Sequence, residues 1–112
     1  MSVNQRQHFR IQYPPDERAK LDVNGTNFEI IDLSQSGLKF ESQSHFPNTG
    51  QIFLMTIHML HGNQHSTKMK VVRVDKPFVM MIFEHPIEKF FIEEEKNYLE
   101  HKYGKFSSAG AY

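Results

Sequence analysis

The chain has 112 residues, and its 13 lysines and arginines balance 13 aspartates and glutamates, so the formal net charge is zero. This length corresponds to one domain, which buries roughly 65% of the surface of its unfolded chain. A general nucleic-acid binder usually carries a basic excess for phosphate contacts, and this chain has none. The sequence contains no cysteine, which excludes disulfide and thiolate chemistry.

The sequence shows neither a secretory signal nor a membrane-spanning stretch. Residues 1–6 lack an apolar region, and no segment approaches the roughly 18 consecutive apolar residues of a membrane helix. We therefore expect a cytoplasmic protein that does not insert into membranes.

The first part of the chain predicts an arm followed by a hairpin. Residues 1–12 are polar and precede the strand-breaking sequence Tyr13-Pro14-Pro15-Asp16, so we expect a flexible N-terminal arm. Apolar residues alternate with polar ones over residues 21–23, which predicts a strand. Asn24-Gly25 then predicts a two-residue turn, because both of its positions tolerate positive φ, and residues 28–33 form the return strand.

Four more strands and one helix are predicted after this hairpin. The strands cover residues 38–40, 51–60, 69–74 and 78–83, and the third of these four is basic. Residues 51–60 are apolar at both odd and even positions, which indicates a strand buried on both sides or next to a domain contact. We expect one all-β domain, an antiparallel barrel or sandwich over residues 13–85, with a C-terminal helix.

The predicted helix covers residues 86–104, and residues 105–112 are expected to be a frayed tail. Apolar residues recur at helical spacing, and residues 93–95, three consecutive glutamates, are expected to form a solvated face. Phe90 and Phe91 are expected to pack as a lid on the end of the barrel, although the helix is also a candidate contact for a partner. Five methionines are expected to fill the core: Met55, Met59, Met69, Met80 and Met81.

Two arginines form the first motif, Arg6-Gln7-His8-Phe9-Arg10. A guanidinium offers five donors in one plane, so it can grip a phosphate or the O6/N7 edge of guanine through two hydrogen bonds. Its flat face can also stack on a base. Taken alone, the RxxxR pattern favours two solvated arginines on a mobile terminus, because two arginines at this spacing are common.

The second motif is Asp32-Leu33-Ser34-Gln35-Ser36-Gly37, which begins 22 positions after Arg10. A carboxylate can accept hydrogen bonds from N1–H and N2–H of guanine, and a serine hydroxyl can reach a phosphate or a base edge. Glycine allows positive φ and a close approach of backbone to ligand. The alternative is a turn in which aspartate and serine bond their own backbone.

An RxxxR followed about twenty residues later by a DxSxxG resembles the PilZ domain, a bacterial receptor for cyclic di-GMP. The resemblance implies a six-stranded antiparallel β-barrel whose N-terminal arm folds over the nucleotide. It implies that Arg6 and Arg10 contact guanine and phosphate. Asp32 and Ser34 would contact guanine and the adjacent phosphate, and Gly37 would keep the turn open.

The residue before the first arginine bears on stoichiometry. Many proteins of this family carry a further arginine at that position. By this resemblance, the further arginine implies a preference for a stacked pair of ligands. Here the position is Gln5, so we expect one ligand per site.

Three histidines and two serines are candidates for metal-binding and catalytic groups. His58, His61 and His65 have a metal-like spacing, but they fall on a predicted strand and on both sides of a predicted hairpin. Ser34 and Ser36 have no histidine partner in a triad-like context. We expect no metal, no cofactor and no enzymatic activity.

The function that we predict is a non-enzymatic cyclic di-GMP receptor whose surface changes on binding and thereby regulates a partner protein. Processes such as motility, pilus assembly or exopolysaccharide export are compatible with the resemblance. One alternative is an adaptor of the same fold that works without nucleotide. Another is a small barrel for single-stranded nucleic acid, suggested by Phe9, Tyr13 and the basic residues 68–76.

Overall fold

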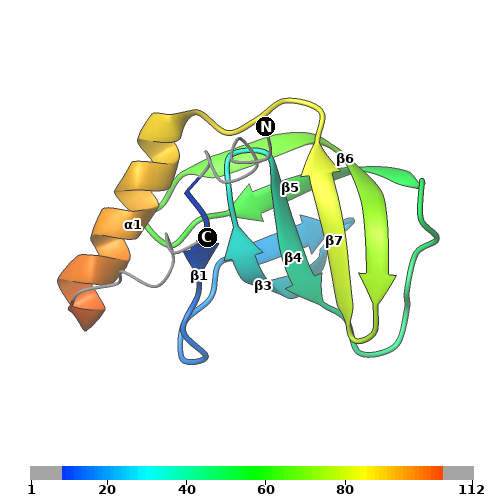
Figure 1. Cartoon of the computed structure of the whole chain (residues 1–112), viewed down its shortest axis with the longest axis horizontal. Helices are drawn as coiled ribbons and strands as arrows, with labels where there is room; N and C mark the ends of the chain where they lie inside the picture. The colour runs from blue at the N-terminus through cyan, green and yellow to red at the C-terminus, as the bar shows by residue number, and fades with distance from the viewer. Residues whose placement is uncertain (1–8, 105–112) are drawn as a thin grey trace, which may run out of the picture.

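The computed structural model describes residues 9–104, which form seven strands and one helix (Figure 1). The elements are β1 (Ile11–Gln12), β2 (Lys20–Val23), β3 (Thr26–Leu33), β4 (Gly37–Glu41), β5 (Ile52–His58), β6 (Gln64–Asp75), β7 (Phe78–Phe83) and α1 (Lys89–Tyr103). Neighbouring strands are antiparallel, in the order β1-β3-β2-β5-β6-β7-β4, and a further pairing of β3 with β4 closes the barrel. The predicted six-stranded antiparallel barrel is confirmed, with β1 as an extra strand on β3.

The first hairpin forms as its sequence predicts. Asn24 and Gly25 have φ values of 53° and 88°, and they join Val23 to Thr26 at the end of the β2–β3 ladder. The carboxylate of Asp22 accepts a hydrogen bond from the amide of Gly25 at 2.8 Å. Both turn residues tolerate the left-handed conformation, so the two strands meet without strain.

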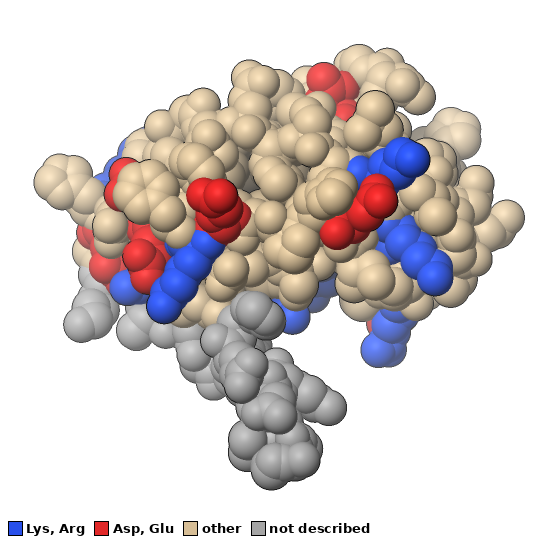
Figure 2. Space-filling view, turned by 90° about the horizontal axis from the view of Figure 1, so that it is seen from above, with Lys and Arg blue, Asp and Glu red and all other residues tan. Residues whose placement is uncertain are grey.

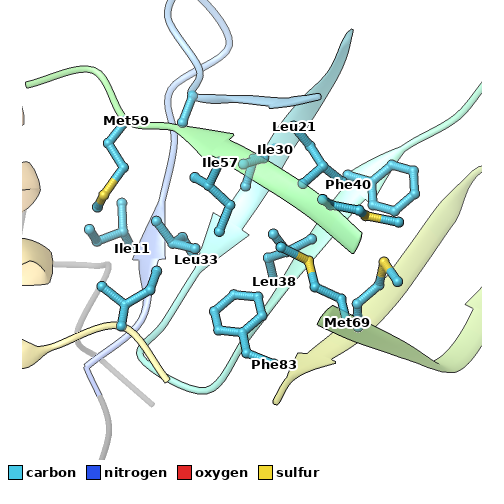
Figure 3. Packing of buried hydrophobic residues seen from close by; sticks show 14 of the residues in the cluster. Ile11, Leu21, Ile30, Leu33, Leu38, Phe40, Ile57, Met59, Met69 and Phe83 are labelled. Carbon is cyan, nitrogen blue, oxygen red and sulfur yellow. The ribbon is translucent and has the colours of Figure 1, made fainter. Parts of the chain in front are cut away.

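The core fills the barrel and extends toward α1, which covers one end of it (Figure 1). Alternate residues of each strand point inward, so side chains from all strands meet in one cluster. Figure 3 shows Ile11 beside Leu33 and Met59 in this cluster, with Phe40 and Met69 farther along the barrel. Strand β1 therefore contributes to the core although it has only two residues.

Several boundaries differ from the prediction, and the largest strand difference is in β6, which begins at Gln64 instead of residue 69. The arm was expected to cover residues 1–12, but Ile11–Gln12 form β1, and the Ile11 side chain is completely buried. The helix begins at Lys89 rather than at residue 86, because the backbone of Ile87 is bonded to Gln35 on both its amide and carbonyl groups. Residues 1–8 and 105–112, which include the rest of the arm and the tail, lie outside the described residues.

Several side chains that were predicted to be buried are exposed or only partly buried. Ile52 and Leu54 are 62% and 69% exposed, because the outer face of β5 has no covering layer among the described elements. Phe90 is 59% exposed, so it does not form a lid, whereas Phe91 packs against the core. Four of the five methionines are buried as expected, but Met80 is only half-buried, because it faces outward from β7.

Glu95 contradicts the expectation of a solvated acidic face, because its side chain is completely buried. Its carboxylate accepts hydrogen bonds from the hydroxyl of Tyr13 at 2.5 Å and from the amides of Leu60 and His61 at 2.9 and 3.0 Å. The Nδ1 atom of His61 lies 2.7 Å from the same carboxylate. Burial, together with Glu95, raises the pKa of Tyr13 well above its usual value. This network holds α1 on the barrel.

Replacing Glu95 by alanine should therefore destabilise the protein strongly. The change leaves buried amides and the Tyr13 hydroxyl without an acceptor, and loss of one partner of a buried charged network costs about 3–5 kcal/mol. Urea unfolding monitored by circular dichroism measures the free energy of unfolding of each variant. Glu94→Ala, at a half-buried position outside this network, is the control and should cost less than about 0.5 kcal/mol. Equal stabilities of the two variants would contradict the role assigned to Glu95.

A second carboxylate, Glu17, holds the last turns of α1. It accepts hydrogen bonds from the hydroxyl groups of Tyr98 and Tyr103 and from the ammonium group of Lys102, at 2.7–2.8 Å. The Lys102 contact, followed by those of the two tyrosines, lowers the pKa of Glu17 to about 2. The ionised form therefore favours the folded state.

Glu17 should make stability depend on pH in acid. Its pKa falls on folding from 4.5 to about 2, so its contribution is complete above about pH 4.5 and is lost as the pH falls toward 2. The difference in unfolding free energy between wild type and Glu17→Gln should shrink over that window. Denaturant titrations at a series of pH values measure it, and a difference independent of pH would contradict this assignment.

No helix among the described residues combines the length and the apolar character needed to cross a membrane.

Candidate functional site

A groove of about 390 Å³ lies where β1, β3, β4 and β7 meet on the outside of the barrel, with one contribution from β6. It brings together four of the five predicted ligand-binding residues: Arg10, Asp32, Ser34 and Gly37. The fifth, Arg6, lies outside the described residues. The other lining residues are Gln12, Ser36, Leu38, Lys39, Val72, Met80, Met81 and Ile82. We call this space the motif groove.

Strand register explains why these side chains meet. Gln12 pairs with Asp32, Asp32 pairs with Lys39, and Lys39 pairs with Met80, so one row crosses β1, β3, β4 and β7. Residues in such a row share one face of the sheet and lie close enough to interact. The row runs beneath the motif groove and supplies its central side chains.

Irregularities in two strands shape the groove. The β3–β4 ladder shifts register between Ile30 and Asp32, and the β6–β7 ladder shifts between Val71 and Arg73. A bulge of this kind turns a side chain away from the regular alternation and often lies next to a binding site. Here the first bulge brings Asp32 opposite Lys39, and the second directs Val72 outward into the groove, where it is 42% exposed.

Asp32 lies between two cations. Its Oδ1 atom accepts a hydrogen bond from Arg10 Nη1 at 3.1 Å, and its Oδ2 atom is 3.8 Å from Lys39 Nζ. The Asp32 side chain is 7% exposed, while those of Arg10 and Lys39 are 43% and 29% exposed. The carboxylate is thus held in place, whereas both cations still reach solvent at the groove.

Ser34 bonds its own turn. Its hydroxyl group donates to the carbonyl of Gly37 at 3.3 Å and accepts from the amide of Gly37 at 3.2 Å, and its own amide donates to the same carbonyl. The residue is 2% exposed. The alternative interpretation of the motif, a self-bonded turn, therefore describes Ser34 in this structure.

Gly37 is required by close packing rather than by positive φ. It pairs with Ile82 on β7, and a Cβ atom at this position would overlap the carbonyl oxygen of Met81. It is not among the described glycines with positive φ. The glycine therefore lets β4 lie close against β7 at the edge of the motif groove.

The turn of the second motif is also bonded to the segment that leads into α1. The carbonyl of Ser36 accepts from the amide of Phe83, and the carbonyl of Gln35 accepts from the amide of Ile87, at 2.9 and 2.8 Å. The side-chain amide of Gln35 donates to the carbonyl of Ile87 at 3.2 Å. Hydrogen bonds therefore connect one side of the motif groove to the residues that lead into α1.

The groove offers both charge and an apolar wall. Arg10 and Lys39 supply positive charge, Asp32 supplies a fixed acceptor, and Val72, Met80 and Ile82 form an apolar side. This combination suits a ligand with a flat aromatic base and a phosphate. Sequence reasoning missed Lys39, Val72 and Met80, because their approach depends on register and bulges that no local pattern indicates.

The three histidines considered as metal ligands point to different partners. His58 lies 3.8 Å from Asp22, His61 contacts Glu95, and His65 Nε2 lies 2.9 Å from the carbonyl of His85. Within residues 9–104 no group of three histidine, aspartate or glutamate side chains is arranged to hold a metal ion.

Comparison with known proteins agrees with this architecture. Residues 4–87 match the family described as the PilZ domain. The fold is similar to the crystal structure of an uncharacterized Legionella protein, with a TM-score of 0.57 and 17% identity over 84% of this chain and 98% of that one. At this identity the likeness shows the fold alone. No curated protein gave a significant match.

The structure thus combines an antiparallel barrel, a helix after the last strand and a groove that groups the residues of the two motifs. The family match covers most of the chain, so the chain belongs to the PilZ domain family, a family of non-enzymatic cyclic di-GMP receptor domains.

Gly37→Ala should disturb the motif groove and the barrel together. The new methyl group would collide with the Met81 carbonyl, so β4 and β7 must separate, and such overpacking costs about 1–3 kcal/mol of unfolding free energy. Ser36→Ala, at an exposed position in the same turn, is the matched control and should be nearly neutral. Thermal and urea unfolding measure both, and a fully stable Gly37→Ala protein would refute the packing argument.

Proposed function

We propose that the motif groove binds cyclic di-GMP and that the protein is a receptor for this second messenger. The observation that supports this most directly is the convergence of Arg10, Asp32, Ser34 and Gly37 on one groove. These residues come from two motifs far apart in the sequence, and the family match makes the ligand class the natural candidate. Arg6 is proposed as a further contact from the arm.

Asp32 is the proposed guanine contact. Its carboxylate is almost buried and is fixed by its neighbours, so it presents an acceptor to N1–H and N2–H of guanine with little loss of side-chain freedom. Adenine offers no donor at N1, so this contact selects guanine. The apolar wall formed by Val72, Met80 and Ile82 would support the face of the base.

Binding would redistribute the charges around Asp32. Arg10 bonds Asp32 in the structure, and its guanidinium would turn toward the phosphate or the O6/N7 edge of guanine. Lys39 remains beside Asp32 and balances its charge, or reaches the phosphate itself. Because the Arg10 side chain is 43% exposed, its ion pair with Asp32 is weak, and a nucleotide would replace it with stronger charge-assisted contacts. This exchange would move Arg10.

The route to a partner would run through α1. Phe9, which lies between the two arginines of the first motif, has the ammonium group of Lys96 at 5.6 Å from its ring centroid. Tyr13, three residues after Arg10, bonds the buried Glu95. A change at Arg10 would thus be transmitted to the helix, where a regulated partner protein would sense it; motility, pilus assembly and polysaccharide export are the proposed kinds of process.

Calorimetric titration of cyclic di-GMP tests the receptor function. Wild type should bind one ligand per site, as Gln5 predicts, and GTP should bind much more weakly. Arg10→Ala removes charge-assisted hydrogen bonds of about 1.5–3 kcal/mol, so its affinity should fall by about 10- to 150-fold. The control is Arg18→Ala, because Arg18 pairs with Glu29 and Glu41 outside the groove.

Two results would contradict the proposal. One is unchanged affinity in a folded Arg10→Ala protein, which would remove the first motif from the site. The other is no binding to folded wild type, which would favour an adaptor of the same fold that acts without nucleotide.

A further inference from the structure

A second groove lies on the outer surface of β5, β6 and β7. It has a volume of about 630 Å³, and its prominent side chains are Ile52, Leu54 and Ile82, which are 62%, 69% and 46% exposed. Ile52 pairs with Lys70 and Lys70 pairs with Ile82, so these residues form one row across three strands. We call this space the β5–β7 groove.

The exposed aliphatic side chains of the described residues are concentrated in this groove. Single exposed aliphatic residues are ordinary on protein surfaces, but several on one face, beside a hollow, are typical of an interaction site. Three of the six large hydrophobic residues that are exposed in the described part of the chain line this one groove. Met69 and Phe83, whose side chains are buried in the core, also line the groove.

The charges in the groove are mostly positive and unpaired. Lys68 and Lys70 project from β6 between the aliphatic residues, and neither forms an ion pair within residues 9–104. Glu84 is the one acidic residue in the described lining. The long stems of the two lysines add apolar surface, and their ammonium groups remain available for carboxylates. Figure 2 shows lysine and arginine side chains at both ends of the molecule, with an acidic side chain among those at the end opposite α1.

The middle of the groove offers no backbone for pairing. Strand β6 is bonded to β5 and β7, and β7 is bonded to β6 and β4, whereas β2 pairs with β5 only from Thr56 to His58. A segment that lies over Lys68, Lys70 and Ile82 must therefore be recognised through side chains.

We propose that the β5–β7 groove is a docking site for an acidic, amphipathic segment of a partner protein. Aliphatic side chains of the segment would enter the hollow between Ile52, Leu54 and Ile82, and its carboxylates would pair with Lys68 and Lys70. Two other occupants fit less well. An anionic membrane is flat, whereas the groove is concave, and it would meet the repulsion of Glu84. Two copies of the groove placed face to face would bring their lysines together.

This proposal does not depend on cyclic di-GMP. Ile82 lines both grooves, so a nucleotide in the motif groove would lie beside the docked segment and could alter its affinity. The docking test is run without nucleotide, so its failure leaves the receptor proposal untouched, and the reverse also holds.

A random dodecapeptide phage library, selected on the folded wild-type protein, tests the docking site. Enriched peptides should combine aliphatic residues with an excess of aspartate and glutamate. Synthetic copies should lose at least about tenfold in affinity on Leu54→Glu, as expected for an anchor residue. The doubly substituted Lys68→Glu, Lys70→Glu protein should lose these peptides and prefer copies with lysine in place of the acidic residues. Phe90→Glu, an exposed apolar position on α1, is the matched control and should bind as wild type does.

Three results would overturn the proposal. The first is no enrichment, or enriched peptides that lack acidic residues or bind Leu54→Glu as tightly as wild type. The second is concentration-dependent self-association in sedimentation that Leu54→Glu abolishes, which would assign the groove to a second copy. The third is Leu54-dependent binding to vesicles of phosphatidylcholine and phosphatidylglycerol, which would assign it to a membrane surface.

Discussion

Strand β3 is hydrogen-bonded to three other strands, and the position of the candidate site depends on these three pairings. Its first residues pair with β2, and its last residues lie between β1 and β4. Asp32 therefore has Gln12 on one side and Lys39 on the other, at the place where the barrel closes. A strand with one neighbour fewer would leave either the arm or the second motif unattached. The bulge at Ile31 and the glycine at position 37 are the local adjustments that this arrangement requires.

The same segment that brings Arg10 to Asp32 continues into the contact with α1. Ile11 is buried in the core, Tyr13 donates to Glu95, and Glu17 accepts from three side chains of the helix. From the other side, the turn of the second motif bonds the residues just before α1. Both motifs are therefore joined to the helix through hydrogen bonds and packing. Under the proposed function, these bonds and contacts are the route by which binding in the motif groove would reach α1.

Local sequence patterns predicted much of the fold, and long-range register determined the rest. The turn at Asn24-Gly25 requires positive φ at two positions, which these two residues alone can satisfy, so the hairpin was predictable. The helix was predictable from the spacing of its apolar residues. Glu95 was not, because three consecutive glutamates look alike and only the positions of Tyr13 and Leu60 make one of them an acceptor in the core. The exposure of Ile52 and Leu54 was also missed, because a run of apolar residues does not say whether a second layer covers the strand.

The most direct test of the central claim is a nuclear magnetic resonance titration of isotope-labelled protein with cyclic di-GMP. The account predicts that amide shifts concentrate at Arg10 and Gln12, from Asp32 to Lys39, and around Met80 to Ile82, with weaker changes spreading through Tyr13 to the residues around Glu95. Shifts confined to β5 and the far end of β6, or no shifts at saturating nucleotide, would contradict it. In that case the convergence of the two motifs would serve to hold the barrel together rather than to bind a ligand.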